Sequence, residues 1–185
     1  KITTVEKIFN LQGVDELSQA QERYLGEKLN TRAIILAATR GSELHSLTYD
    51  KPKTMIRIGG EALLSRTVNK FKKIGINKTI IVAGYKAESI DISGIEIRVN
   101  KDYEIGNELM SLVCAQNDFD NDMVISYGDL LFREYILRDL LEVDGDIVII
   151  VDSALDNPNI TGSPDLASCN QNADRSPFMQ NLILK

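Results

Sequence analysis

A short apolar run at residues 33–36, directly followed by small and polar residues, constrains the fold of this chain more than any other feature. The run is too short and too rich in β-branched side chains for a buried helix, so it predicts a strand covered on both faces. Most of residues 37–42 are small, which lets a backbone approach a ligand closely and point its amides at an anion. Lys51 and Lys53 follow soon after. The pattern favours either a phosphate-binding loop with a lysine folded back over the phosphates, or an ordinary buried strand that ends in a polar turn.

Strand-like and helix-like segments alternate along the rest of the chain. Runs of apolar, largely β-branched residues predict further strands at 79–83, 95–99, 122–127 and 146–151. Apolar residues at helical spacing predict helices at 61–74, 107–116 and 133–142; in the second, Leu109, Leu112 and Val113 are expected to face inward. The composition then becomes polar, which predicts loops and an edge strand at 182–184. The alternation predicts an α/β fold with an open, mainly parallel sheet and flanking helices.

Composition excludes several classes of protein. The 185 residues are enough for one domain, and 27 acidic against 21 basic residues leave a net charge of -6. This balance disfavours nucleic acid as the main partner, because phosphate backbones attract basic patches. No run approaches the roughly 18 apolar residues that span a bilayer, so no membrane partner is expected. Cys114 and Cys169 form no C-x-x-C pair, which indicates free thiols in a reducing, cytoplasmic setting.

The sequence contains one histidine, His45. A single histidine excludes an H-x-G-H nucleotidyltransferase motif and a zinc site with two histidines. The P-loop pattern G-x-x-x-x-G-K-[ST] is absent as well. An enzyme with this sequence is therefore expected to work by positioning its substrates and by the electrostatics of a bound metal.

The loop after the first strand carries a family resemblance. Leu36-Ala37-Ala38-Thr39-Arg40-Gly41-Ser42-Glu43-Leu44, followed by Pro52-Lys53-Thr54-Met55, resembles L-A-A-G-x-G-[ST]-R-L and P-K-x-[LM], the signature of nucleotidyltransferases with the nucleotide-diphospho-sugar transferase fold. Thr39 replaces the first glycine, and Glu43 replaces an arginine that in most relatives faces the triphosphate. The string A-A-T-R-G is similar to one branch, the nucleotidyltransferase domain fused behind phosphoenolpyruvate mutase in phosphonate biosynthesis. The resemblance covers nearly the whole chain.

This resemblance implies a Rossmann-like open sheet with the strand order third-second-first-fourth. It also implies that residues 1–30 are a helical lead-in or a linker from an upstream domain, and that residues 31–185 are the nucleotidyltransferase domain. A helical appendage on the surface of the domain is the alternative for residues 1–30. Relatives continue beyond the last residue of this chain, so a truncation of the C-terminal part, with loss of a second metal ligand, is left open.

The resemblance also implies roles for individual residues. Lys53 and Arg40 would be catalytic: Lys53 would neutralise charge on the α-phosphate, and Arg40 could take over the role that Glu43 cannot fill. Asp129, in S-Y-G-D, matches the metal-binding aspartate of the family and would hold Mg²⁺. The implied nucleotide-binding residues are Leu36, Ala37, Ala38, Thr39, Gly41, Ser42, Ala83, Gly84, Tyr85, Asn107 and Ser111. Asp152 would lie near the acceptor.

Simpler roles are open for several of these residues. Lys53 can be a solvated loop lysine, and Tyr85 can belong to the core. Asp129 and Asn107 can be helix caps, since both residue types cap helices well.

The implied function is transfer of a nucleoside monophosphate, CMP from CTP, to a small phosphonate or phosphate acceptor, with Mg²⁺ and with release of pyrophosphate. A phosphocholine cytidylyltransferase or a sugar-1-phosphate nucleotidyltransferase is the nearest rival. The absence of tryptophan and 6% aromatic residues weakly disfavour choline, whose ammonium group binds to aromatic walls. A non-catalytic domain that binds nucleotide or tethers a partner is the rival from another class. Self-association into a homo-oligomer is left open.

Overall fold

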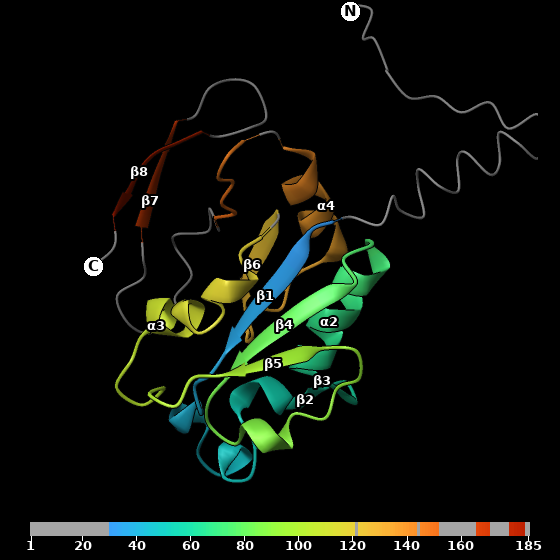
Figure 1. Ribbon diagram of the computed structural model, residues 1–185, viewed down its shortest axis with the longest axis vertical. Coiled ribbons are helices and arrows are strands. Elements are labelled where there is room, and N and C mark those ends of the chain that lie inside the picture. Colours follow the sequence, from blue (N-terminus) through green and yellow to red (C-terminus); the bar gives the residue numbers. More distant parts are fainter. Residues whose placement is uncertain (1–29, 121, 144, 152–165, 171–177, 184–185) are drawn as a thin grey trace, which may run out of the picture. The chain divides into compact units, whose positions relative to one another are not determined.

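The computed structural model describes residues 30–120, 122–143, 145–151, 166–170 and 178–183 (Figure 1). Its largest sheet has four parallel strands, β1 (Arg32–Ala37), β4 (Lys78–Ala83), β5 (Glu96–Val99) and β6 (Met123–Tyr127). Their order is β5-β4-β1-β6, which is the predicted third-second-first-fourth order. The predicted open α/β sheet is therefore confirmed. The lead-in predicted before residue 30 and the position of Asp152 lie outside the described residues.

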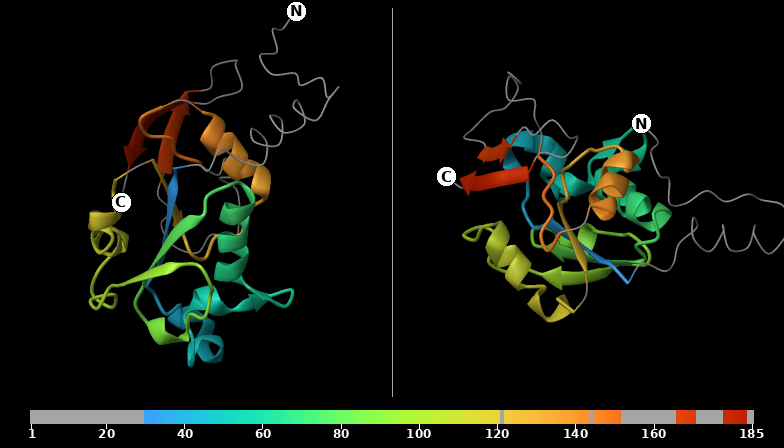
Figure 2. Two further views of the ribbon diagram at one scale, coloured as in Figure 1. Left: turned by 45° about the vertical axis from the view of Figure 1, so that its right-hand side comes forward. Right: turned by 90° about the horizontal axis from the view of Figure 1, so that it is seen from above.

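Helices flank both faces of this sheet. Helix α2 (Leu63–Lys73) and helix α3 (Glu108–Val113) lie on opposite faces (Figures 1 and 2). Because successive side chains of a strand point to opposite faces, β1 and β4 contribute to both cores. On the side of α3 the buried cluster consists of Ile34, Ile80, Val82 and Ala115, with Leu36, Leu112 and Met123 packed against it. The fully buried side chains of the other face are those of Ile35, Ile81, Leu64, Val68 and Phe71.

Helix α2 ends just before Gly75, close to the predicted end at residue 74. Gly75 has a φ of 96°, a left-handed conformation that a residue without a side chain adopts easily. The N–H groups of Gly75 and Ile76 donate to the carbonyls of Lys72 and Phe71, at 3.1 and 3.0 Å. These are the two hydrogen bonds of a Schellman motif, which satisfies the last carbonyls of the helix.

The remaining elements are short. The hairpin of β2 (Arg57–Ile58) and β3 (Glu61–Ala62) precedes α2. Short 3-10 segments lie in the described loops: η1 (Ser42–Thr48), which is interrupted at His45, η2 (Lys53–Met55), η3 (Ala87–Ser89) and η4 (Gln116–Asp118). The chain divides into two compact units after Arg138, within α4 (Glu134–Glu142). In the second unit β7 (Leu166–Asn170) pairs antiparallel with β8 (Phe178–Ile183). No helix among the described residues is both long and apolar enough to cross a bilayer.

Three local predictions are wrong. Residues 146–151 form no strand in the described structure, and Ile147 is 83% exposed, because β-branched residues form a strand only where a neighbouring strand pairs with them. Helix α3 ends at Val113 instead of 116, and Leu109 and Val113 are exposed instead of inward-facing, since so short a helix presents only one edge to the sheet. The last strand, β8, begins at Phe178, well before the predicted 182–184.

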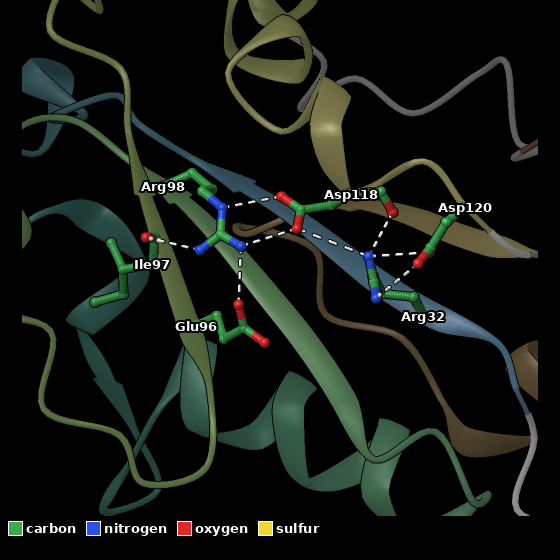
Figure 3. Close-up of polar contacts among 6 residues, drawn as sticks. All are labelled: Arg32, Glu96, Ile97, Arg98, Asp118 and Asp120. Atoms are coloured by element: carbon green, nitrogen blue, oxygen red, sulfur yellow. Dashed lines mark hydrogen bonds and ion pairs between the residues drawn. The ribbon is translucent and has the colours of Figure 1, made fainter.

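A network of arginines and carboxylates ties the turn after α3 to the sheet (Figure 3). Arg98 of β5 donates two hydrogen bonds to the Asp118 carboxylate, at 2.9 and 2.8 Å. Arg32, at the start of β1, donates to the Asp118 backbone carbonyl at 2.6 Å and lies 3.1 Å from Asp120. The hydrogen bonds to Asp118 and then to Glu96 raise the pKa of Arg98 above its ordinary value. Because Asp118 is the last residue of η4, the network anchors the chain that follows α3 to β1 and β5.

Asp118→Asn is expected to destabilise the protein by about 2 kcal/mol, the usual worth of hydrogen bonds to a charged group, since it weakens the bidentate pair with Arg98. The Asp118 side chain is only 13% exposed, whereas that of Asp120 is 57% exposed. Asp120→Asn is therefore the control and should change stability by less than about 0.5 kcal/mol. Urea denaturation measures both. Equal stability of Asp118→Asn and the unmutated protein would show that the network does not hold the fold.

Candidate active site

Two loops leave the sheet where the carboxyl ends of β1 and β6 lie side by side (Figure 1). The Gly128 N–H donates to the Leu36 carbonyl at 2.8 Å, so the chain after β6 stays close to the end of β1. A side chain at Gly128 would lie 2.8 Å from the Thr54 methyl group. The absence of that side chain lets η2 pack over the end of β6. As a result Lys53, the first residue of η2, reaches Asp129.

Lys53 is held from several sides. Its Nζ lies 2.6 Å from Asp129 Oδ2 and 3.9 Å from Glu43 Oε1. Its backbone N–H donates to the Arg40 carbonyl at 3.0 Å. A side chain on Gly41, whose φ is 75°, would lie 2.6 Å from Lys53 Cβ, so the lysine stem packs directly on the glycine backbone. The structure thus brings together the small-residue loop, the lysine and the carboxylate that the sequence singled out.

Two cavities open at this edge of the sheet and share Thr39, Lys53 and Tyr103. The larger, of about 510 Å³, is lined by residues 39–43 together with Lys53, Tyr85, Tyr103 and Glu104. The smaller, of about 80 Å³, is lined by residues 36–39, Lys53, Thr54, Tyr103, Tyr127, Asp129 and the first part of α3. The walls of the two cavities include every predicted catalytic, nucleotide-binding and metal-binding residue except Ala83 and Gly84.

Ala83 and Gly84 lie behind the cavity wall. Ala83 is fully buried at the end of β4. A side chain on Gly84 would lie 2.6 Å from the Ala38 carbonyl oxygen and 2.6 Å from Tyr103 Cβ. Gly84 therefore lets Tyr103 pack against the end of β1. The predicted contact of Ala83 and Gly84 with a nucleotide stays a prediction.

The start of α3 contributes to the smaller cavity. Asn107 caps the helix, since its Oδ1 accepts from the Met110 N–H at 3.1 Å. The Ser111 Oγ accepts from Asn100 Nδ2 at 3.0 Å and is buried. The capping role foreseen for Asn107 is therefore present, and its side chain still lines the cavity. Asp129, in contrast, caps no helix, because α4 begins at Glu134.

Arg40 stacks between two tyrosine rings at the larger cavity. Its guanidinium carbon lies 5.3 Å from the ring centre of Tyr49 and 5.3 Å from that of Tyr85. Among the described residues, Arg40 makes no ion pair with a carboxylate, and its Nε is buried without a hydrogen-bond partner. The predicted cation is thus present at the cavity, and Tyr85 contacts it instead of lying in the core.

Sequence reasoning missed Tyr49, Tyr103 and Glu104. Tyr103 packs edge-on to Tyr85, with ring centres 6.2 Å apart, and its hydroxyl donates to Glu104 at 3.2 Å. Burial raises the pKa of Tyr103, and the Glu104 carboxylate raises it further. The three residues form no motif in the chain. The close approach of Tyr103 and of the Ala38 carbonyl to Gly84 explains why a glycine follows β4.

The donor set at the cavities fits one kind of metal binding. Among the described residues no group of three histidine, cysteine or acidic side chains could enclose an ion. Mg²⁺, however, commonly binds one or two carboxylates together with substrate phosphates and water. Asp129, 41% exposed and beside the cavity lysine, fits such a site. Glu43 is the next carboxylate, on the other side of the same lysine.

Comparison with known proteins agrees with this geometry. Residues 33–175 match the MobA-like NTP transferase domain. This chain belongs to that family. A CTP:phosphoglutamine cytidylyltransferase from Campylobacter jejuni is 28% identical over 66% of this chain and 53% of its own length. A CMP-5'-(3-aminopropyl)phosphonate synthase from Streptomyces rubellomurinus is 28% identical over 59% of this chain and 19% of its own length.

A solved structure supports the same assignment. The CTP:phosphocholine cytidylyltransferase of Streptococcus pneumoniae aligns with a TM-score of 0.52 and 30% identity, over 56% of this chain and 47% of that chain. The chain spans about half the length of the first cytidylyltransferase relative. The region that matches the family, residues 33–175, includes the parallel sheet except Arg32 and the residues that line both cavities.

Proposed function

We propose that this protein transfers CMP from CTP to a phosphonate or phosphate oxygen of a small acceptor and releases pyrophosphate. The observation that carries the proposal is the Lys53–Asp129 pair, 2.6 Å apart, at the place where the two cavities meet. A cation and a metal-binding carboxylate at one point suit a reaction whose charge builds up on a phosphorus centre. The larger cavity has room for a nucleotide and the smaller one for part of a compact acceptor.

In the proposed reaction an acceptor oxygen forms a bond to the α-phosphorus of CTP, while the bond from that phosphorus to the bridging oxygen of the β-phosphate breaks. The oxygen of a phosphonate or phosphate is already ionised at neutral pH, so no strong general base is needed. Lys53 would neutralise charge on the α-phosphate. The amides of residues 39–42 would hold the phosphate chain. Asp129 would hold Mg²⁺, which supplies charge neutralisation and alignment when bound.

The choice of CTP and of a phosphonate rests on relatives and on one motif. Two relatives named above are cytidylyltransferases, and a third makes a CMP-linked aminopropylphosphonate. The A-A-T-R-G string, residues 37–41, points to the branch associated with phosphoenolpyruvate mutase. We also propose that this domain follows a phosphoenolpyruvate mutase domain in the full-length protein, with residues 1–30 as the linker. The cytoplasm is the proposed location.

Pyrophosphate release from the full-length protein in Mg²⁺ tests the proposal. Each of CTP, UTP, ATP and GTP is combined with an aminoalkylphosphonate, phosphocholine or glucose 1-phosphate. We expect CTP with the phosphonate to react fastest. A faster reaction with a purine triphosphate would contradict the base, and a faster reaction with glucose 1-phosphate would favour the sugar-phosphate rival. Nucleotide binding in a thermal-shift assay without turnover on any acceptor would instead identify a binding domain.

A further inference from the structure

The stacking of Arg40 is more than a surface contact. Tyr49 lies in the loop after η1 and Tyr85 lies after β4, so the two rings come from separate parts of the chain. The Tyr85 hydroxyl donates to the Tyr49 backbone carbonyl at 2.9 Å, and the Tyr85 N–H donates to the Ala38 carbonyl at 2.9 Å. These hydrogen bonds hold the Tyr85 ring against the Tyr49 backbone and the end of β1. The Arg40 guanidinium, 5.3 Å from both ring centres, therefore lies against a Tyr85 ring that is already fixed.

The charges of the larger cavity single out Arg40 as well. Lys53 is compensated by Asp129 and approached by Glu43. Arg40 has no carboxylate partner among the described residues, and its Nε is buried without a hydrogen bond. Burying a donor without a partner is costly, whereas an arginine fork matches the geometry of phosphate oxygens. A partly buried arginine without a carboxylate partner is therefore better suited to bind the oxygens of a polyphosphate chain than to bind the uncharged ring of a nucleobase.

The position that carries the triphosphate arginine in the signature holds Glu43 here, and Glu43 turns toward Lys53. We infer that Arg40, clamped between Tyr49 and Tyr85, forms the subsite for the β- and γ-phosphates, the part that leaves as pyrophosphate. This inference rests on the proposed function. It makes Tyr49 and Tyr85 positioning residues for the arginine, in place of the direct nucleotide contact that the resemblance implies for Tyr85.

The exposure of Tyr49 agrees with this role. The residue is 64% exposed and so adds little to the core. An aromatic face within about 6 Å of a guanidinium attracts the cation and limits its motion. A planar guanidinium that is already ordered loses less freedom when it binds an anion. The ring is therefore placed to increase phosphate affinity without touching the phosphate.

Calorimetric titration with inorganic pyrophosphate, CTP and CMP tests the clamp in the full-length protein. Pyrophosphate lacks a base and CMP lacks the outer phosphates, so together they separate the two ends of the ligand. We expect Tyr49→Leu to weaken pyrophosphate and CTP binding about 3- to 10-fold, the usual worth of a cation–π contact, with CMP binding changed less than about 2-fold. Tyr49→Phe, which keeps the ring, should restore most of the lost affinity. Tyr135→Leu, an exposed tyrosine of α4 outside both cavities, is the control.

The outcomes separate this inference from the proposed function. If the unmutated protein binds pyrophosphate and CTP but Tyr49→Leu binds them equally well, the clamp is wrong and the function stands. If Tyr49→Leu weakens CMP as much as pyrophosphate, the ring acts on the base or on the fold, and the clamp is again wrong. Should Tyr49→Leu fail to fold, Arg40→Lys decides, since it keeps the charge but loses the fork; unchanged pyrophosphate affinity there overturns the inference. If the unmutated protein binds neither pyrophosphate nor CTP, both proposals fail.

Discussion

Lys53→Ala is expected to lower kcat by about 10²-fold or more, the usual effect of removing one preorganised charge donor from a transition state. Lys53 already lies at the junction of the two cavities, 2.6 Å from Asp129. Charge on the α-phosphorus grows as the new bond forms, so the ammonium stabilises the transition state more than bound CTP. The Kd for CTP should therefore change little. Single-turnover kinetics and a CTP titration measure the two quantities separately.

Lys51→Ala is the matched control for this experiment. Lys51 belongs to the same segment, but its one ion pair with a described residue is to the neighbouring Asp50, at 3.5 Å, and it lines neither cavity. Ordering a flexible surface lysine costs about as much entropy as its contacts gain, so the removal of Lys51 should change kcat less than about 2-fold. Normal turnover by Lys53→Ala would show that the role implied by the signature does not apply to this chain.

Asp129→Asn is expected to reduce magnesium-dependent turnover by at least about 10²-fold, because a metal that neutralises phosphate charge is worth several kcal/mol to the transition state. The amide keeps the size of the side chain but loses its charge. The fold should persist, since Asp129 is 41% exposed and caps no helix. Turnover measured over a magnesium series, with a melting curve for each variant, gives both results.

Asp50→Asn removes a carboxylate that is 75% exposed and outside both cavities, and it should leave turnover unchanged. If Asp129→Asn reaches normal turnover at high magnesium, Asp129 is not the metal ligand. If the variant unfolds while Asp50→Asn stays folded, Asp129 has a structural role through its pair with Lys53.

Much of the parallel sheet could be predicted because its signals are local. β-Branched runs such as residues 79–83 are short, continuous and bounded by turn residues, and they become strands with neighbours on both sides. The run at 146–151 has the same composition but forms no strand in the described structure. Strand formation depends on a partner, and a single sequence does not show which runs find one.

The candidate site, like the sheet, could be predicted only in part from the sequence. The signature predicted that Lys53, Asp129 and the loop at residues 39–42 belong together, and the structure places them at the same cavities. Tyr49 and Tyr103 could not be predicted. They reach the larger cavity region through contacts between distant segments, such as the stacking of Tyr49 on Arg40 and the packing of Tyr103 against Gly84. Side-chain contacts of this kind leave no periodic pattern in the chain.

The contact between Gly41 and Lys53 holds the lysine in place independently of the segment that links these two residues. The hydrogen bond from the Lys53 N–H to the Arg40 carbonyl closes the base of a surface loop, and the lysine stem seals it against the glycine. Within the closed loop, residues 43–47 are exposed. Because the entropy cost of closing a loop rises only slowly with its length, such a segment can change in sequence or size while its base stays in place. The tip of this loop is thus a segment beside the larger cavity that can vary between related proteins without displacing the lysine.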